Sequence, residues 1–147
     1  MADIVFNIAK GKVAYYAGLP ATNDALILVP IETSGLESDA TLRDYDNLSV
    51  LLAASNNEQS TMGRKTLASV TVTTNDTNDR VEVDAADVTW TAATGNAVSA
   101  AVICYDPDTT GGTDTDLIPL VKLDMVVTPG GGDITLVFNS GGFYQAS

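Results

Sequence analysis

The order of apolar and polar residues along the chain predicts a protein built mainly from β-strands. Residues 25–31 (ALILVPI) form a continuous apolar run whose length and branched side chains fit a strand buried on both faces. From residue 66 the pattern changes to alternation, with valines two residues apart on each side of the polar loop 75–79. This alternation predicts a hairpin over residues 66–84 with one solvent-facing side.

Other short apolar segments, separated by turns that contain glycine, predict further strands. These segments cover residues 3–8, 12–16, 87–91, 98–105, 117–127 and 134–138. Regularly spaced short strands are typical of an antiparallel sandwich or a barrel. No segment has the composition of a linker, so we expect a single β-rich domain over residues 1–147.

One segment departs from the strand pattern. Its apolar residues recur at spacings of three and four, which is the helical period; they are Leu42, Tyr45, Leu48, Leu51 and Leu52. We therefore expect one amphipathic helix at about residues 40–54. Its apolar stripe should pack on the sheet, because a short helix is not stable alone in water.

The charge balance narrows the possible partners. Charged residues make up only 18% of the chain and hydrophobic residues 45%, which favours a homo-oligomer, a dimer or a trimer, in which another subunit covers part of the surface. The net charge of −12 repels nucleic-acid phosphates and anionic lipid headgroups, so we expect no nucleic-acid or membrane partner. We expect no signal peptide, and the single cysteine fits synthesis in a reducing compartment.

The residue types present limit the chemistry that this chain can perform. It has no histidine, which excludes serine–histidine and cysteine–histidine catalytic arrangements and most zinc sites. Cys104 lies in an apolar segment without a nearby base, where a thiol is unreactive. We interpret Cys104 and the single tryptophan, Trp90, as core residues, and we expect that the protein is not an enzyme.

The densest group of acids is the strongest candidate for a functional site. Asp106, Asp108, Asp114 and Asp116 lie in the segment DPDTTGGTDTD, whose opening is similar to a calcium-binding loop. However, the twelfth position is Leu117 rather than a bidentate glutamate, and strands rather than helices flank the loop. Aspartate, threonine and glycine are also common in long hairpin loops. We therefore expect neither a metal nor another cofactor, and the four aspartates remain weak metal candidates.

Several segments are similar to those of a known family. The similarity covers most of the chain from Leu42 onward, and its strongest parts are DTNDRVEVD (76–84), Thr89-Trp90 and CYDPDTTGGTD (104–114). These segments resemble the decoration (cement) proteins of tailed bacteriophages. The resemblance implies a β-rich, frequently jelly-roll-like module that is synthesised in the host cytoplasm and oligomerises on the capsid exterior of the virion. There it would clamp neighbouring subunits of the major capsid protein. The resemblance supplies no catalytic residue.

Two other functions are compatible with the sequence. The first is a tail-fibre or adhesin-type module that binds a host or a glycan, in which Trp90, Tyr105 and the aspartate loop would form a calcium-assisted carbohydrate site. The second is a carboxylate-based hydrolase, which has less support because no paired acids lie in an evidently apolar pocket.

Overall fold

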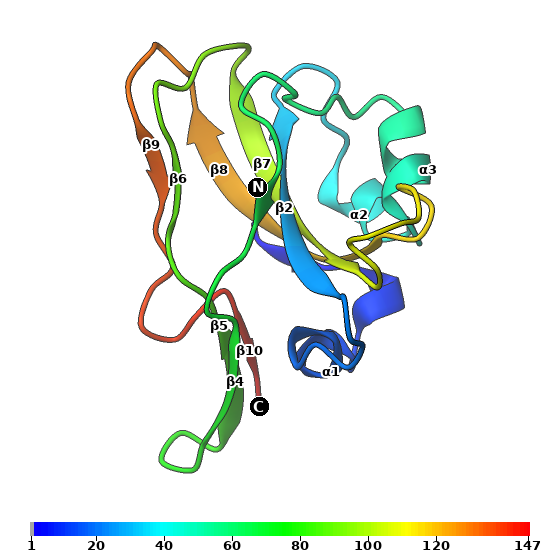
Figure 1. The fold of residues 1–147 in the computed structure, drawn as a ribbon, viewed down its shortest axis with the longest axis vertical. Coiled ribbons are helices and arrows are strands. Elements are labelled where there is room, and N and C mark those ends of the chain that lie inside the picture. The colour runs from blue at the N-terminus through cyan, green and yellow to red at the C-terminus, as the bar shows by residue number, and fades with distance from the viewer. Residues whose placement is uncertain (1) are drawn as a thin grey trace.

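The computed structural model describes residues 2–147 and contains three antiparallel sheets (Figure 1). The strands are β1 (Ile4–Val5), β2 (Ala25–Glu32), β3 (Lys65–Thr66), β4 (Thr71–Asn75), β5 (Arg80–Asp84), β6 (Val88–Trp90), β7 (Val98–Asp106), β8 (Ile118–Val127), β9 (Ile134–Leu136) and β10 (Tyr144–Ala146). The largest sheet has the order β1-β8-β7-β2-β3, and the others are β10-β5-β4 and β6-β9. The predicted mainly β, antiparallel class is confirmed. The sheets stay open rather than closing into a barrel, which is consistent with a sandwich.

The centre of the five-stranded sheet is buried on both faces. Along β2 and β7 successive side chains alternate between two cores, with Leu28 and Ile103 in one and Val29 and Cys104 in the other. The first core includes Trp90 of β6, and the second is covered by the helices α2 (Asp39–Leu42) and α3 (Leu48–Ala53). Figure 1 accordingly shows β6 and β9 on one side of the sheet and the two helices on the other. The prediction that residues 25–31 form a strand buried on both faces is confirmed.

The helix predicted at residues 40–54 is wrong in its continuity, because two short helices stand in its place. Asn47 has extended backbone dihedral angles, and its Oδ1 accepts a hydrogen bond from the Val50 N–H at 3.0 Å, so it begins a new helix. The predicted packing is confirmed, since Leu42, Leu48 and Leu51 are all buried against the sheet. The apolar period therefore continues through the break while the backbone does not.

The N-terminal segment also differs from the prediction. Only Ile4–Val5 of residues 3–8 forms a strand, and a short 3-10 helix, η1 (Asn7–Ala9), follows it. Residues 12–16 were expected to form a strand, but the helix α1 (Val13–Ala17) occupies this position. Val13 and Ala17 are buried one helical turn apart, whereas a strand would have placed them on the same face as the exposed Tyr15.

The three-stranded sheet β10-β5-β4 forms an arm that projects from the rest of the molecule (Figure 1). The hairpin predicted over residues 66–84 is present in its core as β4 and β5, joined by the turn at residues 76–79. The short strand β10 pairs with the other side of β5. No alternating pattern in the sequence had predicted β10.

Candidate functional site

The acidic loop after β7 meets a basic residue from a distant part of the chain. The guanidinium group of Arg64 donates from Nε and Nη2 to the two carboxylate oxygens of Glu58, at 2.8 and 2.7 Å. It also donates from Nη1 and Nη2 to the carboxylate of Asp114, at 2.6 and 2.8 Å. Arg64 thus forms a bidentate ion pair with each of the two carboxylates. Bidentate pairing is the strongest interaction that an arginine makes with a carboxylate.

Backbone hydrogen bonds hold both segments of this network in place, the one with Glu58 and Arg64 and the one with Asp114. The segment that carries Glu58 and Arg64 is held to β2, because the N–H of Gln59 donates to the carbonyl of Pro30 at 2.9 Å. On the other side, the N–H of Ser49 in α3 donates to the carbonyl of Asp114 at 3.0 Å. Arg64 thereby connects the edge of the sheet to the loop that lies over α3.

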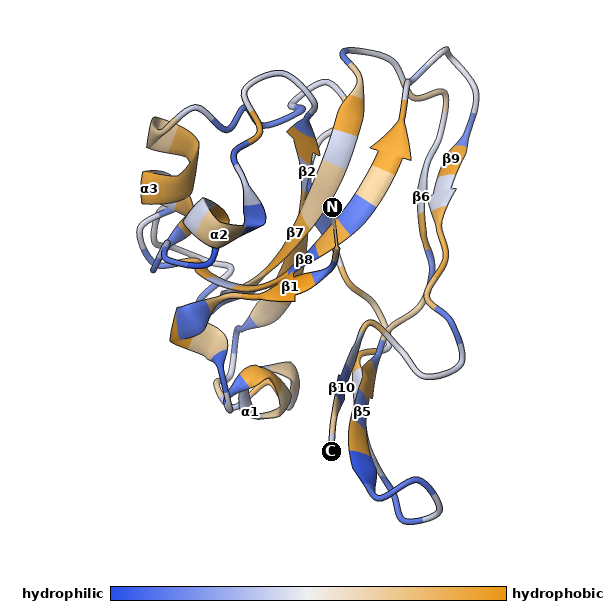
Figure 2. Cartoon of the chain, turned by 180° about the vertical axis from the view of Figure 1, so that it is seen from behind, coloured by the Kyte–Doolittle hydropathy of each residue, from blue (hydrophilic) through white to orange (hydrophobic). Residues whose placement is uncertain are grey.

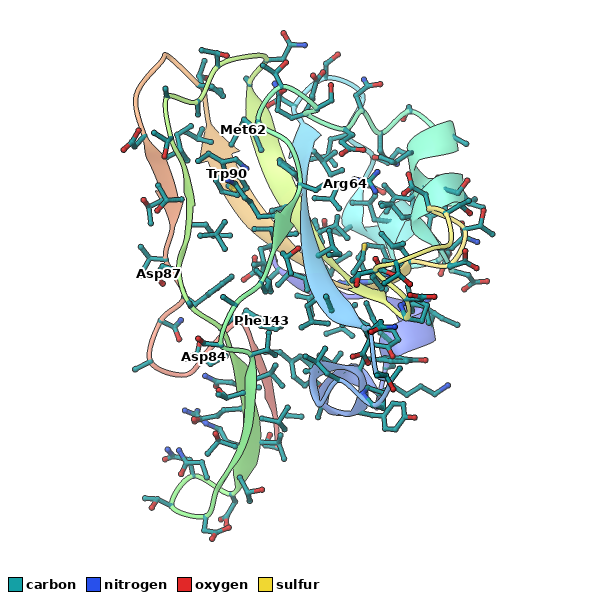
Figure 3. The ribbon with its side chains drawn as sticks, viewed as in Figure 1. Met62, Arg64, Asp84, Asp87, Trp90 and Phe143 are labelled. Atoms are coloured by element: carbon teal, nitrogen blue, oxygen red, sulfur yellow. The ribbon has the colours of Figure 1, made fainter. Side chains whose placement is uncertain are left out.

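A shallow pocket of about 310 Å³ lies beside this network. Acidic, basic and a few apolar side chains line this pocket. The lining residues are Ile27, Arg64, Lys65, Thr66, Asp106, Gly111, Gly112, Thr113, Asp114 and Leu117. Figure 3 shows Arg64 on the side of the sheet that faces α3, and Trp90 on the side of β6. The pocket therefore belongs to the face of the helices and the acidic loop.

The hydrogen bonds around Arg64 shift the pKa values of this network toward the charged forms. The hydrogen bonds from Arg64 hold the pKa of Asp114 below its usual value, against a smaller opposing effect of burial. The carboxylates of Asp114 and Glu58 in turn raise the pKa of Arg64. A general acid near neutral pH needs a carboxyl group whose pKa is raised, so the shift of Asp114 has the wrong direction for that role.

The four aspartates proposed as metal candidates do not converge on one point. Asp114 binds Arg64, whereas Asp116 accepts a hydrogen bond from the Thr113 N–H at 2.9 Å within its own turn. Asp106 accepts from the Asp108 N–H at 3.0 Å, and Asp108 accepts from the N–H and hydroxyl of Thr110. Within residues 2–147, no group of three acidic or thiol side chains is placed to hold a metal ion. Asp106, Asp108 and Asp116 instead accept hydrogen bonds within local turns, as is usual in aspartate-rich loops, and Asp114 forms an ion pair with Arg64.

Cys104, Trp90 and Tyr105 are all buried, as the sequence predicted for the first two. Burial raises the pKa of the Cys104 thiol, which makes the nucleophilic thiolate unfavourable. The indole N–H of Trp90 donates to the carbonyl of Gly63 at 2.9 Å, and the hydroxyl of Tyr105 donates to Asp24 at 2.8 Å. Neither aromatic ring is available at the surface to stack on a sugar.

The residues that organise this site, Arg64 and Glu58, were missed by the sequence interpretation. They lie in the polar segment between α3 and β3, 50 positions from Asp114 in the case of Arg64, and no local pattern links them. One indication was available: Arg64 belongs to a very small set of basic residues, seven against 19 acids. With so few basic residues, each of them is a candidate partner for an acidic cluster.

Comparison with known proteins gives no match, whether to family models, to curated proteins or to solved structures. Within residues 2–147, no helix has the length and apolar character needed to cross a membrane.

Proposed function

We propose that this protein is a structural component of a tailed-bacteriophage virion that decorates the capsid exterior. In this proposal it is a homo-oligomer that stabilises the shell by clamping neighbouring major capsid subunits, and its sandwich is of the jelly-roll type. The observation that carries the proposal is the resemblance of the segments 76–84, 89–90 and 104–114 to decoration proteins. No ligand, catalysis or cofactor is required for this role.

The use of the acidic side chains supports a role in assembly rather than in chemistry. The segment 104–114 contains the carboxylates that looked most reactive in the sequence, yet Asp108 and Asp114 are held ionised by hydrogen bonds, their pKa values being lowered by Thr110 and Arg64 respectively. These bonds close turns and join distant segments. A protein that must withstand stress on a capsid benefits from such cross-links.

The surface also offers features that a protein partner could use. Val126 of β8 and Val137, which follows β9, have 84% and 65% of their surface exposed. Asp124 and Val137 line one small pocket, so the two strands lie close together in this region. Exposed aliphatic side chains on a chain of net charge −12 fit a partner that offers both apolar contacts and basic groups.

The composition of purified virions tests this proposal. Quantitative mass spectrometry of virions should find this protein at a copy number close to that of the major capsid protein. A handful of copies per particle would place it in the tail and would favour the tail-fibre or adhesin alternative. Complete absence from virions would exclude both.

The alternative of a glycan-binding module has less support from the geometry. Such a site needs exposed aromatic rings and a convergent set of ligands for calcium. Trp90 and Tyr105 are buried, and the four aspartates bind elsewhere. A host-binding function would therefore have to use a different surface.

A further inference from the structure

The edge strands of the three sheets differ in how well they are protected against pairing with another chain. An exposed edge normally carries charges, prolines, bulges or covering groups that prevent such pairing. β1 and β3 contain two residues each, and β6, β9 and β10 contain three. The edge beyond β1 is further blocked, because the Asp3 carboxylate accepts the N–H of Asp124 at 2.7 Å. β4 has five residues and is therefore the longest outer strand of the part that the structure describes.

β4 itself also lacks the charges, prolines and bulges that protect an edge. The segment 67–75 (LASVTVTTN) has no charged residue, no proline and no glycine, and its valines and threonines favour strands. Four of the five residues of β4 are exposed, among them Val72 with 41% of its surface accessible. β4 and β5 pair in continuous register without a bulge. The edge formed by β4 is thus uncharged, exposed and free of bulges.

The hydrogen-bond pattern of the arm shows which backbone groups point outward. The carbonyl of Val83 in β5 accepts a hydrogen bond from the N–H of Phe143 at 2.9 Å, so the polar groups of Val83 face β10. Backbone groups alternate in direction along a strand, so the neighbouring Glu82 faces β4. Its partner in the register, Thr73, therefore faces β5.

It follows that Val72 and Thr74 direct their N–H and C=O groups away from β5. Among residues 2–147, these groups have no hydrogen-bond partner on the outer side of β4. The outer side of β4 thus presents two N–H donors and two C=O acceptors, on residues two positions apart. An additional antiparallel strand could pair with these groups.

We propose that β4 pairs antiparallel with β4 of a second copy of this chain, which joins the two arms into one six-stranded sheet. A two-fold axis at Thr73 places Val72 opposite Thr74 of the second copy, and the reverse. Each of these two pairs exchanges two backbone hydrogen bonds, so all four outward donors of the two strands are used. Thr73 lies opposite Thr73 of the second copy, and a cross-strand pair of threonines is favourable.

The absence of charge along the edge favours a second copy as the occupant, despite the acidity of the whole chain. Because residues 67–75 are uncharged, no like charges lie opposite each other in the paired strands. The acids of the turn, Asp76 and Asp79, lie at opposite ends of the joined sheet in the two copies. Three residues on each side of the axis separate the two Asp76 positions by about 20 Å. This exceeds the screening length of about 8 Å at physiological salt, so their repulsion is weak.

The shape of the molecule permits this pairing. In both views the arm extends beyond the five-stranded sheet, away from α2 and α3, while α1 lies beside its base (Figures 1 and 2). Antiparallel arms therefore carry the two bodies at opposite ends of the joined sheet. The inference rests on the homo-oligomer in the proposed function, but it does not depend on the capsid.

Sedimentation equilibrium of the full chain from about 10 µM to 1 mM tests this proposal. The wild type should form a dimer, and Thr74→Pro should weaken the dimer at least about tenfold, because it removes two of the four hydrogen bonds. The Thr74 N–H makes no bond to β5, so proline at this edge position should leave the fold intact. Thr74→Ala keeps the N–H and serves as the matched control, which should dimerise as the wild type does.

Amide hydrogen exchange of the wild type provides an independent readout if Thr74→Pro does not fold. Protection of the Val72 and Thr74 amides should rise with protein concentration, and rising salt should leave the dimer unchanged or strengthen it. A wild type that stays monomeric with both amides unprotected overturns the proposal, as does a Thr74→Pro variant of unchanged dimer mass. Protection that appears only when a lysine-flanked Thr-Val peptide is added would also overturn it and assign the edge to a basic partner strand. None of these outcomes changes the virion copy number, which tests the proposed function separately.

Discussion

Lys122 is fully buried, and its ammonium group donates a hydrogen bond to Asp39 Oδ1 at 2.9 Å. Lys122 lies in the middle of β8, and Asp39 is the first residue of α2, so this ion pair joins the sheet to the helices that cover it. A second bond of 2.7 Å from the same nitrogen reaches Asp124 Oδ1. An ammonium ion without water needs such partners, because burying an unpaired charge is very costly.

Removing the charge of Asp39 should therefore destabilise the fold. We expect Asp39→Asn to lower the free energy of unfolding by about 2 kcal/mol, since a hydrogen bond between charged groups becomes a weaker neutral one. Asp46→Asn is the matched control, because Asp46 is exposed and lies in the same segment. Its effect should stay within about 0.5 kcal/mol. Urea denaturation of both variants measures the difference, and equal effects would show that the buried pair contributes no stability.

Acid should destabilise the protein through its hydrogen-bonded carboxylates. Burial alone would raise the pKa of Asp39, but the bonds from Lys122 and the Ala2 N–H outweigh it and hold this pKa below its usual value. Arg64 likewise lowers the pKa of Asp114. A carboxyl group with a depressed folded-state pKa stabilises the fold above its unfolded pKa of about 3.9, and this contribution is lost as the pH falls toward the folded value.

The stability of the wild type should thus be nearly constant from pH 7 to about pH 5 and fall steeply below about pH 4. Asp114→Asn should be less stable at neutral pH but should show a shallower loss in acid. Chemical denaturation at a series of pH values checks this. Parallel pH profiles for the two proteins would rule out a contribution of the Arg64 pair.

Cys104 should react with thiol reagents only when the protein unfolds. Its side chain is fully buried between β7 and the helices, and burial raises its pKa. We expect labelling by a disulfide reagent to be at least about a hundredfold slower in the native protein than in denaturant. Cys104→Ser should cost about 1–3 kcal/mol, because it buries a hydroxyl group without a designed partner. Rapid native labelling would contradict the observed packing.

The central sheet could be predicted because the residue pattern of each strand indicates which of its faces are buried. The runs 25–31 around Val29 in β2 and 100–105 around Cys104 in β7 are continuously apolar and rich in branched residues, which favours a strand covered on both faces. The valine alternation around the turn 76–79 similarly predicted the β4–β5 hairpin. In these elements, local pattern and tertiary packing agree.

Other features depended on contacts between distant residues and had no local pattern. The break between α2 and α3 occurs at Asn47, whose capping bond to Val50 competes with a continuous helix that the leucine spacing alone favours. α1 forms where a five-residue apolar segment fits a helix and a strand equally well, so packing of Val13 decides between them. The acidic partners of Arg64 and Lys122 could not be predicted from the sequence, because the two residues of each pair lie far apart along the chain and meet only in the fold.

The acidic loop should hold its shape without a metal ion. Its carboxylates already accept hydrogen bonds from the loop itself or from Arg64, so calcium would have to displace them. We expect the melting temperature to change by less than about 1 °C with excess EDTA or with millimolar calcium, because an ion that does not bind the folded state cannot stabilise it. A shift of several degrees with calcium would restore the metal site among the four aspartates.

The proposed capsid role predicts how attachment depends on salt. A protein of charge −12 should be guided to its site by basic groups of the capsid protein, which act mainly on the association rate. Raising salt from about 0.05 to 0.5 M should slow attachment to undecorated capsids more than it accelerates release. Surface plasmon resonance on immobilised capsids separates the two rates, and an association rate independent of salt would contradict electrostatic guidance.

The stability of capsids with and without this protein tests the central claim most directly. Capsids from which it has been removed should stay closed but release their DNA at a lower temperature than intact particles. Adding back the purified protein, without any cofactor, should restore the original temperature, since many modest contacts act together in a multivalent oligomer. If stripped and decorated particles release DNA at the same temperature and the protein does not rebind, it is not a capsid decoration protein.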